Sequence, residues 1–119
     1  MLIFAHRGAS GTEPENTLRA IKAALDMNVD GIEIDIHEAD NEIFVIHDSW
    51  LHRTTTGKGK IFQHNTEYLQ RLDAGLGERI PTLDEVLSLV SDKCIINIEL
   101  KGINNINLLF SYIDNRAGL

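Results

Sequence analysis

The sequence predicts an α/β fold in which helices pack against a mainly parallel sheet. Short runs rich in β-branched apolar residues alternate along the chain with longer segments whose apolar residues recur every three or four positions. Polar side chains suited to catalysis stand at the expected carboxyl ends of those short runs. That edge of the sheet is where α/β proteins build their binding sites, so the same pattern predicts a functional site.

The composition is that of a soluble globular protein. The chain has 119 residues, 43% hydrophobic and 24% charged, so one domain spanning residues 1–119 is expected. Its net charge of −7 argues against a nucleic-acid-binding protein, which needs a basic surface. No run of about 18 apolar residues is present, so no membrane span is expected. The strand-like start leaves no room for a signal peptide, and a cytoplasmic location is expected.

The first half of the chain has the pattern of a strand, a helix and a β-hairpin. The apolar run at 2–6 is short and predicts a buried strand. At 15–28 the apolar residues recur at spacings of three and four, which predicts a helix. Two extended runs, at 31–36 and 43–46, flank a polar turn at 38–42 and predict a hairpin.

The second half returns to helix and strand after an irregular stretch at 49–80. Thr82 and Glu85 have the spacing of a capping box, in which each side chain satisfies a backbone N–H of the other, so a helix is expected to begin there. Three further elements are predicted: a short helix at 66–72, a buried strand at 94–100 and a final helix at 105–115.

Three acidic residues stand on strands whose other residues are mainly apolar. Glu33 and Asp35 are two residues apart on one strand, so both side chains leave the same face. Carboxylates this close repel each other unless a cation lies between them, and Glu99 can supply a third if its strand lies nearby. Ligation by oxygen alone favours Mg²⁺ or Ca²⁺. The alternative is an exposed edge with solvated acids, and flanking residues such as Ile34 argue against it.

Basic residues stand at the same strand ends. His6 ends the first strand and His47 ends the hairpin, and a pair of imidazoles can divide general-base and general-acid work near neutral pH. Arg7 and Lys101 can bind the non-bridging oxygens of a phosphate. Each residue taken alone has a structural alternative. Their convergence with three acids favours a catalytic site.

The register of the hairpin decides whether His47 reaches the acids. A three-residue loop at Asp40–Glu42 places His47 opposite Asp35, whereas a two-residue loop places it on the other face. We expect the three-residue loop because that register forms a site. The remaining histidines are expected to have structural roles: His37, which is placed on the face opposite the acids, His52 and His64.

Seven ordered motifs spread over about residues 3–102 carry a resemblance to a known family. They are His6-Arg7-Gly8-Ala9-Ser10, Pro14-Glu15-Asn16-Thr17, Gly31-Ile32-Glu33-Ile34-Asp35, Ile46-His47-Asp48, Leu51 with Arg53-Thr54-Thr55 and Gly57, Ile80-Pro81-Thr82-Leu83, and Asn97-Ile98-Glu99-Leu100-Lys101. Together they resemble the glycerophosphodiester phosphodiesterase family.

The resemblance implies a TIM-barrel phosphodiesterase that uses a divalent cation, Mg²⁺ or Ca²⁺. It implies roles for seven residues: Glu33, Asp35 and Glu99 bind the metal, His6 and His47 are the catalytic acid/base pair, and Arg7 and Lys101 bind the substrate phosphate. The implied substrates are small deacylated phospholipids such as glycerophosphocholine or glycerophosphoethanolamine. The implied products are glycerol 3-phosphate and the free alcohol.

A TIM barrel takes about 250 residues, so the chain is expected to form only about the first half of a (β/α)8 barrel. A half-barrel leaves open sheet edges and an uncovered apolar face, which predicts a homo-oligomer or a missing C-terminal half as partner. Three hypotheses therefore stay open: an active phosphodiesterase within an assembly or a longer protein, a non-catalytic half-barrel that binds a divalent cation or a phosphate ligand, and a phosphodiesterase for another lipid or nucleotide head group.

Overall fold

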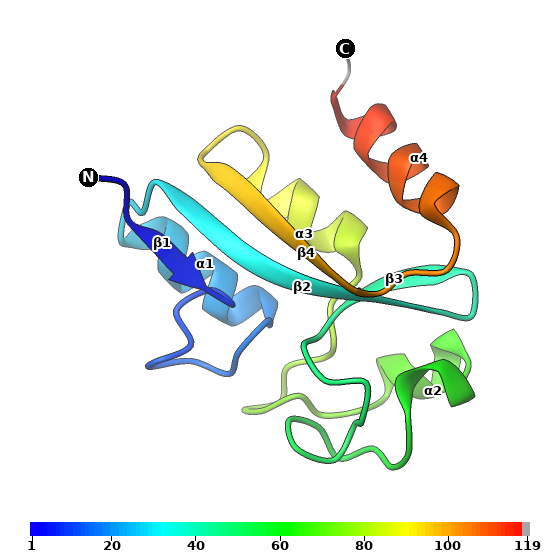
Figure 1. Ribbon diagram of the computed structural model, residues 1–119. Coiled ribbons are helices and arrows are strands. Elements are labelled where there is room, and N and C mark those ends of the chain that lie inside the picture. Colours follow the sequence, from blue (N-terminus) through cyan, green and yellow to red (C-terminus); the bar gives the residue numbers. More distant parts are fainter. Residues whose placement is uncertain (118–119) are drawn as a thin grey trace.

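The computed structural model describes residues 1–117 and has the alternating strands and helices of an α/β fold (Figure 1). The elements in order are β1 (Phe4–His6), α1 (Leu18–Asp26), β2 (Gly31–Ala39), β3 (Glu42–Val45), the 3₁₀ helix η1 (Ile61–Gln63), α2 (Thr66–Gln70), α3 (Leu83–Val90), β4 (Ile95–Gly102) and α4 (Ile106–Ala117). Each element predicted from the sequence is present, with its bounds shifted by a few residues. The expected burial of two strands is wrong: β1 and β4 lie at the edges of the sheet and are largely exposed. No helix among residues 1–117 is both long and apolar enough to cross a membrane.

The sheet is open and mixed, with β2 at its centre. β1 and β4 both run parallel to β2, and β3 returns antiparallel to it after a tight turn. Among the described residues β1 and β4 pair with no strand other than β2, so each has an unpaired edge. The carboxyl ends of β1, β2 and β4 therefore lie at one edge of the sheet, which is where the sequence places the candidate site.

Alternation along β2 separates the core from the site. Ile32, Ile34 and Ile36 are fully buried in a cluster with residues of α1 and α3, two helices that cover one face of the sheet (Figure 1). Burial of each isoleucine side chain contributes roughly 1.5–3 kcal/mol. Glu33 and Asp35 occupy the intervening positions, so their side chains leave the opposite face.

The first helix begins three residues later than predicted. Asn16 has a φ of 56°, in the left-handed region, so the helix cannot extend back through it. Thr17 is the N-cap, and its hydroxyl accepts a hydrogen bond from the N–H of Ala20 at 3.2 Å. Glu15 and Asn16 therefore belong to the loop after β1, where their side chains can reach the edge of the sheet.

The three-residue loop expected for the hairpin is wrong. Two residues, Asp40 and Asn41, join the strands, and their φ values of 52° and 57° are those of a type I′ turn. This turn is favoured because its twist matches that of the paired strands. The ladder is shifted by one residue from the expectation, so Asp35 and His47 are not opposite each other.

The irregular segment at 49–80 packs against the hairpin through a second hydrophobic cluster. Phe44, Leu51, Ile61 and Leu69 are fully buried in it. Packing in this cluster holds the loop after β3 in place, although the segment contains only the short helices η1 and α2. The predicted capping box is present at the start of α3. The Thr82 N–H donates to Glu85 Oε1 at 3.0 Å, and the Glu85 N–H donates to Thr82 Oγ1 at 3.2 Å.

Candidate active site

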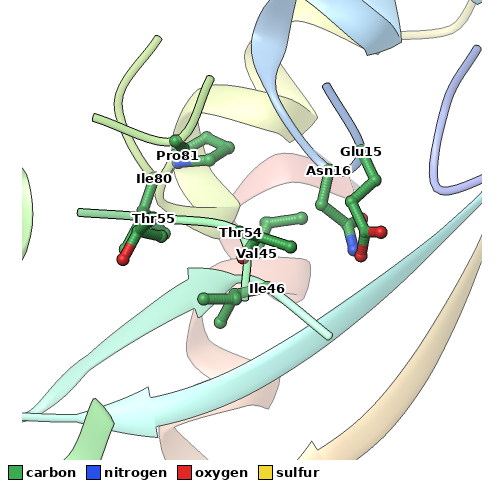
Figure 2. A pocket seen from close by; sticks show the side chains of 9 residues that line it. Glu15, Asn16, Val45, Ile46, Thr54, Thr55, Ile80 and Pro81 are labelled. Atoms are coloured by element: carbon green, nitrogen blue, oxygen red, sulfur yellow. The ribbon is translucent and has the colours of Figure 1, made fainter. Parts of the chain in front are cut away.

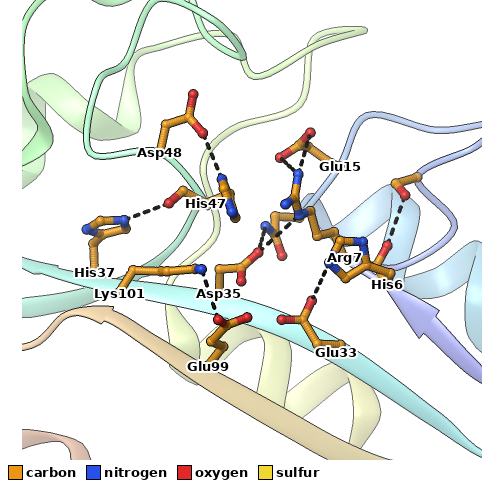
Figure 3. Close-up of polar contacts among 12 residues, drawn as sticks. His6, Arg7, Glu15, Glu33, Asp35, His37, His47, Asp48, Glu99 and Lys101 are labelled. Atoms are coloured by element: carbon orange, nitrogen blue, oxygen red, sulfur yellow. Dashed lines mark hydrogen bonds and ion pairs between the residues drawn. The ribbon is translucent and has the colours of Figure 1, made fainter.

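Three carboxylates meet on the face of the sheet that the helices leave free (Figure 3). Asp35 on β2 is paired in register with Glu99 on β4, and Glu33 stands two residues earlier on β2. One oxygen from each of the three carboxylates lies within 4.8 Å of the others. The structure therefore brings together all three acids that the sequence singles out.

The electrostatics of this acidic triad (Glu33, Asp35 and Glu99) fit a cation. Asp35 is fully buried, and the Glu33 side chain is only 12% exposed. Burial, and then the neighbouring Asp35 and Glu99, raise the pKa of Glu33 to about 7. Among the described residues, both oxygens of Glu33 and one of Asp35 are buried without a hydrogen-bond partner. Buried carboxylate oxygens are costly without compensation, which a bound cation could provide.

His6 and Arg7 enter the site from the end of β1. His6 is paired with Glu33 in the parallel register, and its Nε2 lies 3.6 Å from Glu33 Oε1. Its side chain is 64% exposed, so it is accessible from solvent. Arg7 has a φ of 58°, which turns the chain out of the strand, and its Nε lies 3.3 Å from Asp35 Oδ2. Both basic groups thus contact the acidic triad.

Lys101 stands two residues after Glu99 on the same face of β4. Its Nζ donates to Glu99 Oε1 at 2.9 Å. This contact holds the pKa of Glu99 below its ordinary value, so Glu99 is a carboxylate at neutral pH. Lys101 therefore contributes positive charge at the rim of the triad.

His47 reaches the site despite the unexpected register. β3 ends at Val45, so strand alternation does not constrain His47. Its Nδ1 lies 2.8 Å from Asp48 Oδ1, and its backbone carbonyl accepts a hydrogen bond from His37 Nε2 at 2.9 Å. In Figure 3 the His47 ring lies between Asp48 and Asp35. The orientation of the His47 side chain is therefore set by the loop that follows β3, and not by the register of the strands.

Several residues that sequence reasoning did not assign to the site complete it: Glu15, Asn16, His37, Asp48 and Arg53. Asn16 Nδ2 donates to Asp35 Oδ2 at 3.0 Å, and Glu15 lies 3.3 Å from Arg7 Nη1. The placement of His37 on the opposite face was wrong, because residues two apart on a strand share a face. The sequence did contain one signal that could have identified them: each of these residues except His37 belongs to one of the seven ordered motifs.

Two cavities lie beside these groups. The smaller one, of about 10 Å³, has room for one water molecule and lies against Glu15 and Asn16 (Figure 2). The larger one, of about 360 Å³, is lined by Lys101, His37 and Phe62 among others. Only the larger cavity has the size of a small-molecule site.

Residues 6–111 match the glycerophosphoryl diester phosphodiesterase family. The chain belongs to this family. It is 45% identical over 110 residues to the glycerophosphodiester phosphodiesterase of Caldanaerobacter subterraneus subsp. tengcongensis, an alignment that covers 85% of this chain and 45% of the relative. A glycerophosphodiester phosphodiesterase of Bacillus subtilis is 36% identical over 118 residues, with 86% of this chain and 40% of the relative covered.

Solved structures of the family have the same fold over this length. The crystal structure of the glycerophosphodiester phosphodiesterase of Agrobacterium tumefaciens superposes with a TM-score of 0.93 at 32% identity, covering 98% of this chain and 54% of that one. A phosphodiesterase of Oleispira antarctica, in complex with the product sn-glycerol-3-phosphate, gives a TM-score of 0.92 at 32% identity, covering 98% and 53%. The chain spans about half the length of these proteins. Over that length the match confirms the predicted fold class, an α/β fold that corresponds to about half of a TIM barrel.

Proposed function

We propose that this chain supplies the catalytic groups for metal-dependent hydrolysis of glycerophosphodiesters to glycerol 3-phosphate and an alcohol. The observation that carries the proposal is the acidic triad, with three carboxylates within 4.8 Å and buried oxygens that lack hydrogen-bond partners among the described residues. Membership of the family supports the reaction class. The product complex of the Oleispira antarctica phosphodiesterase supports the glycerol phosphate part of the substrate.

Glu33, Asp35 and Glu99 would hold a divalent cation, Mg²⁺ or Ca²⁺. All three offer carboxylate oxygens, which these hard ions prefer over nitrogen or sulfur ligands. When bound, the ion would supply Lewis acidity and neutralise charge on the phosphate group.

His6 and His47 would move protons at the reacting phosphate. One imidazole would accept the proton of the attacking water or of the neighbouring glycerol hydroxyl, and the other would protonate the leaving alkoxide. Arg7 and Lys101 would bind the non-bridging oxygens and stabilise the charge that builds on them in the transition state. Contacts of 3.6 Å from His6 to Glu33 and 3.3 Å from Arg7 to Asp35 support the placement of two of these groups at the triad.

We also propose that the chain works with a partner that covers its sheet edges, either a second copy or a separate second half. The edge strands expose large apolar residues: Phe4 is 40% exposed, Ile95 53% and Leu100 48%. Exposed apolar residues on unpaired strand edges favour association. The cytoplasmic location expected from the sequence stays a prediction.

The proposed activity is tested by release of glycerol 3-phosphate from glycerophosphocholine by the purified chain, with Mg²⁺ or Ca²⁺ and with a chelator. Metal-dependent release that His47→Ala abolishes and His52→Ala retains is the expected result. His52 is a matched control because it is an exposed histidine whose ring packs on Trp50. Parallel assays with glycerophosphoethanolamine and a nucleotide diester distinguish the alcohol groups.

A second candidate function is a non-catalytic half-barrel that binds a divalent cation or a phosphate ligand. The exposure of the His6 and Glu99 side chains, 64% and 54%, favours it, because the described residues leave this side of the site open to solvent. A folded chain that binds the cation but releases no glycerol 3-phosphate would contradict the first proposal and support this one.

A further inference from the structure

A continuous series of hydrogen bonds and ion pairs connects His47 to Arg7 through three residues without a role in the proposed reaction. The Nδ1 of His47 lies 2.8 Å from Asp48 Oδ1. Arg53 donates to both oxygens of Asp48, at 2.6 and 3.0 Å, and to both oxygens of Glu15, at 3.0 and 2.9 Å. Glu15 also accepts hydrogen bonds from Arg7 Nη1 at 3.4 and 3.3 Å. The loops after β1 and after β3 are thus joined at the site.

Asp48 decides which nitrogen of the His47 ring carries the proton. Hydrogen bonds from Arg53, and less strongly from His47, hold the pKa of Asp48 well below its usual range, so it is a carboxylate with no proton to donate. The 2.8 Å contact therefore requires that Nδ1 carries the proton and donates it to Asp48. Nε2 of the neutral ring is left as a proton acceptor, which is the form that a general base needs.

Arg53 is well suited to hold two carboxylates at once. Its guanidinium group is planar and makes paired contacts on two sides, a geometry that a lysine cannot reproduce. Burial alone would raise the pKa of Glu15, but Arg53 and Arg7 outweigh it and hold that pKa below its ordinary value. Since Arg53 is 45% exposed, these pairs add little to stability, and their main effect is geometric.

We propose that Asp48 is the positioning residue of His47 and is itself held by Arg53. Glu15 extends the same arrangement to Arg7. The acid/base histidine and the phosphate-binding arginine are then ordered as one unit, although they come from loops far apart in the sequence. The use of His47 in catalysis rests on the proposed function, but its orientation by Asp48 rests on the contacts alone.

The test is NMR spectroscopy of the ¹⁵N-histidine-labelled chain in chelator, at about pH 8.5, two units above the ordinary imidazole pKa. Long-range ¹H–¹⁵N correlations report which ring nitrogen is protonated, and the signals of His47 are assigned from the spectrum of His47→Ala. We expect the Nδ1–H tautomer for His47 in the wild-type chain. We expect Asp48→Ala to shift it to the Nε2–H tautomer, because Nδ1 then has no acceptor.

Arg53→Lys keeps the charge and loses the paired contacts, so it should lower the Nδ1–H fraction without unfolding the chain. Arg79→Lys is the matched control, because Arg79 is a 57% exposed arginine before α3 whose ion pair with Glu85 on that helix takes no part in the site. It should leave the His47 signals unchanged. If Asp48→Ala fails to fold by circular dichroism, Arg53→Lys decides the question by the same readout.

An Nε2–H tautomer in the wild-type chain, or Nδ1–H signals that neither variant changes, would overturn the proposal. This readout needs no turnover, so its failure is distinct from failure of the proposed hydrolysis. Where the chain releases glycerol 3-phosphate, Asp48→Ala should also lower kcat about 10- to 100-fold with a smaller change in KM.

Discussion

Asp35 and Glu99 are direct neighbours on two parallel strands, one fully buried at the centre of the sheet and the other exposed at its edge. The parallel register places their side chains on one face, and Glu33 adds a third carboxylate on that face. Like charges at this spacing destabilise a sheet unless a proton or a cation compensates. The stability of the fold therefore depends on what neutralises these three carboxylates, a proton or a cation.

Stability in chelator should fall as the pH rises from about 5 to about 8. The pKa of Glu33 is raised from 4.5 to about 7 in the folded chain, so between these values the folded state binds more protons than the unfolded state. The unfolding free energy then decreases with rising pH, by an amount on the order of 2 kcal/mol. Urea unfolding at a series of pH values measures it. Glu33→Gln should flatten the curve, and a wild-type curve that rises over this window would contradict the assignment.

The capping box of α3 should contribute measurably to stability. Thr82→Ala removes the hydroxyl that accepts the N–H of Glu85 at 3.2 Å, and the expected loss is about 1 kcal/mol of unfolding free energy. Ser88→Ala, at an exposed position of the same helix, is the control and should change stability by less than about 0.5 kcal/mol. Equal effects of the two substitutions in urea unfolding would argue against the cap.

The two-residue turn of the hairpin makes a prediction about Asn41. Its φ of 57° is tolerated by asparagine and glycine but is strained for other residues. Asn41→Ala should therefore cost about 1 kcal/mol, whereas Asn41→Gly should be neutral or slightly stabilising. Thermal unfolding of the two variants measures the difference. If both variants behaved alike, the chain would not adopt the left-handed conformation at this position.

The unpaired edge of β4 should drive association. Ile95 is 53% exposed on a strand that pairs only with β2 among residues 1–117. Sedimentation velocity over a range of concentrations should show a concentration-dependent dimer or larger species for the wild-type chain. Ile95→Lys should weaken it, because a charged residue on an edge disfavours strand pairing. Met27→Lys is the control, since Met27 is 63% exposed at the end of α1. A wild-type chain that stays monomeric throughout would contradict the prediction.

Local sequence patterns predicted the structure correctly where it depends on residues within a single helix or strand. The alternation of Ile32 and Ile34 with Glu33 and Asp35 predicts both the strand and the face that carries the acids. The capping residues of α3 predict its start in the same way. These signals depend on neighbours only a few residues apart, and the structure agrees with them.

Local sequence patterns did not predict the structure where it depends on contacts between residues far apart in the sequence. Two- and three-residue loops both suit the hairpin sequence, and the twist of the paired strands selects the shorter one. The left-handed conformation of Asn16 shortens α1, and its side chain reaches Asp35 on another element. Arg53 contacts Glu15 across 38 residues of sequence, a separation at which no periodicity carries information. Contacts of this kind follow from the packed fold alone.

Calorimetric titration of Mg²⁺ and Ca²⁺ into the metal-free chain, beside Asp35→Asn, tests most directly that the acidic triad is a cation site. We expect about one cation bound per chain, with affinity that rises with pH as Glu33 loses its proton, and at least a tenfold loss in the variant. Asp92→Asn, an exposed acid in the turn before β4, should bind as the wild-type chain does. A folded wild-type chain that binds neither ion, or an Asp35→Asn variant that binds as tightly as the wild type, would contradict the account.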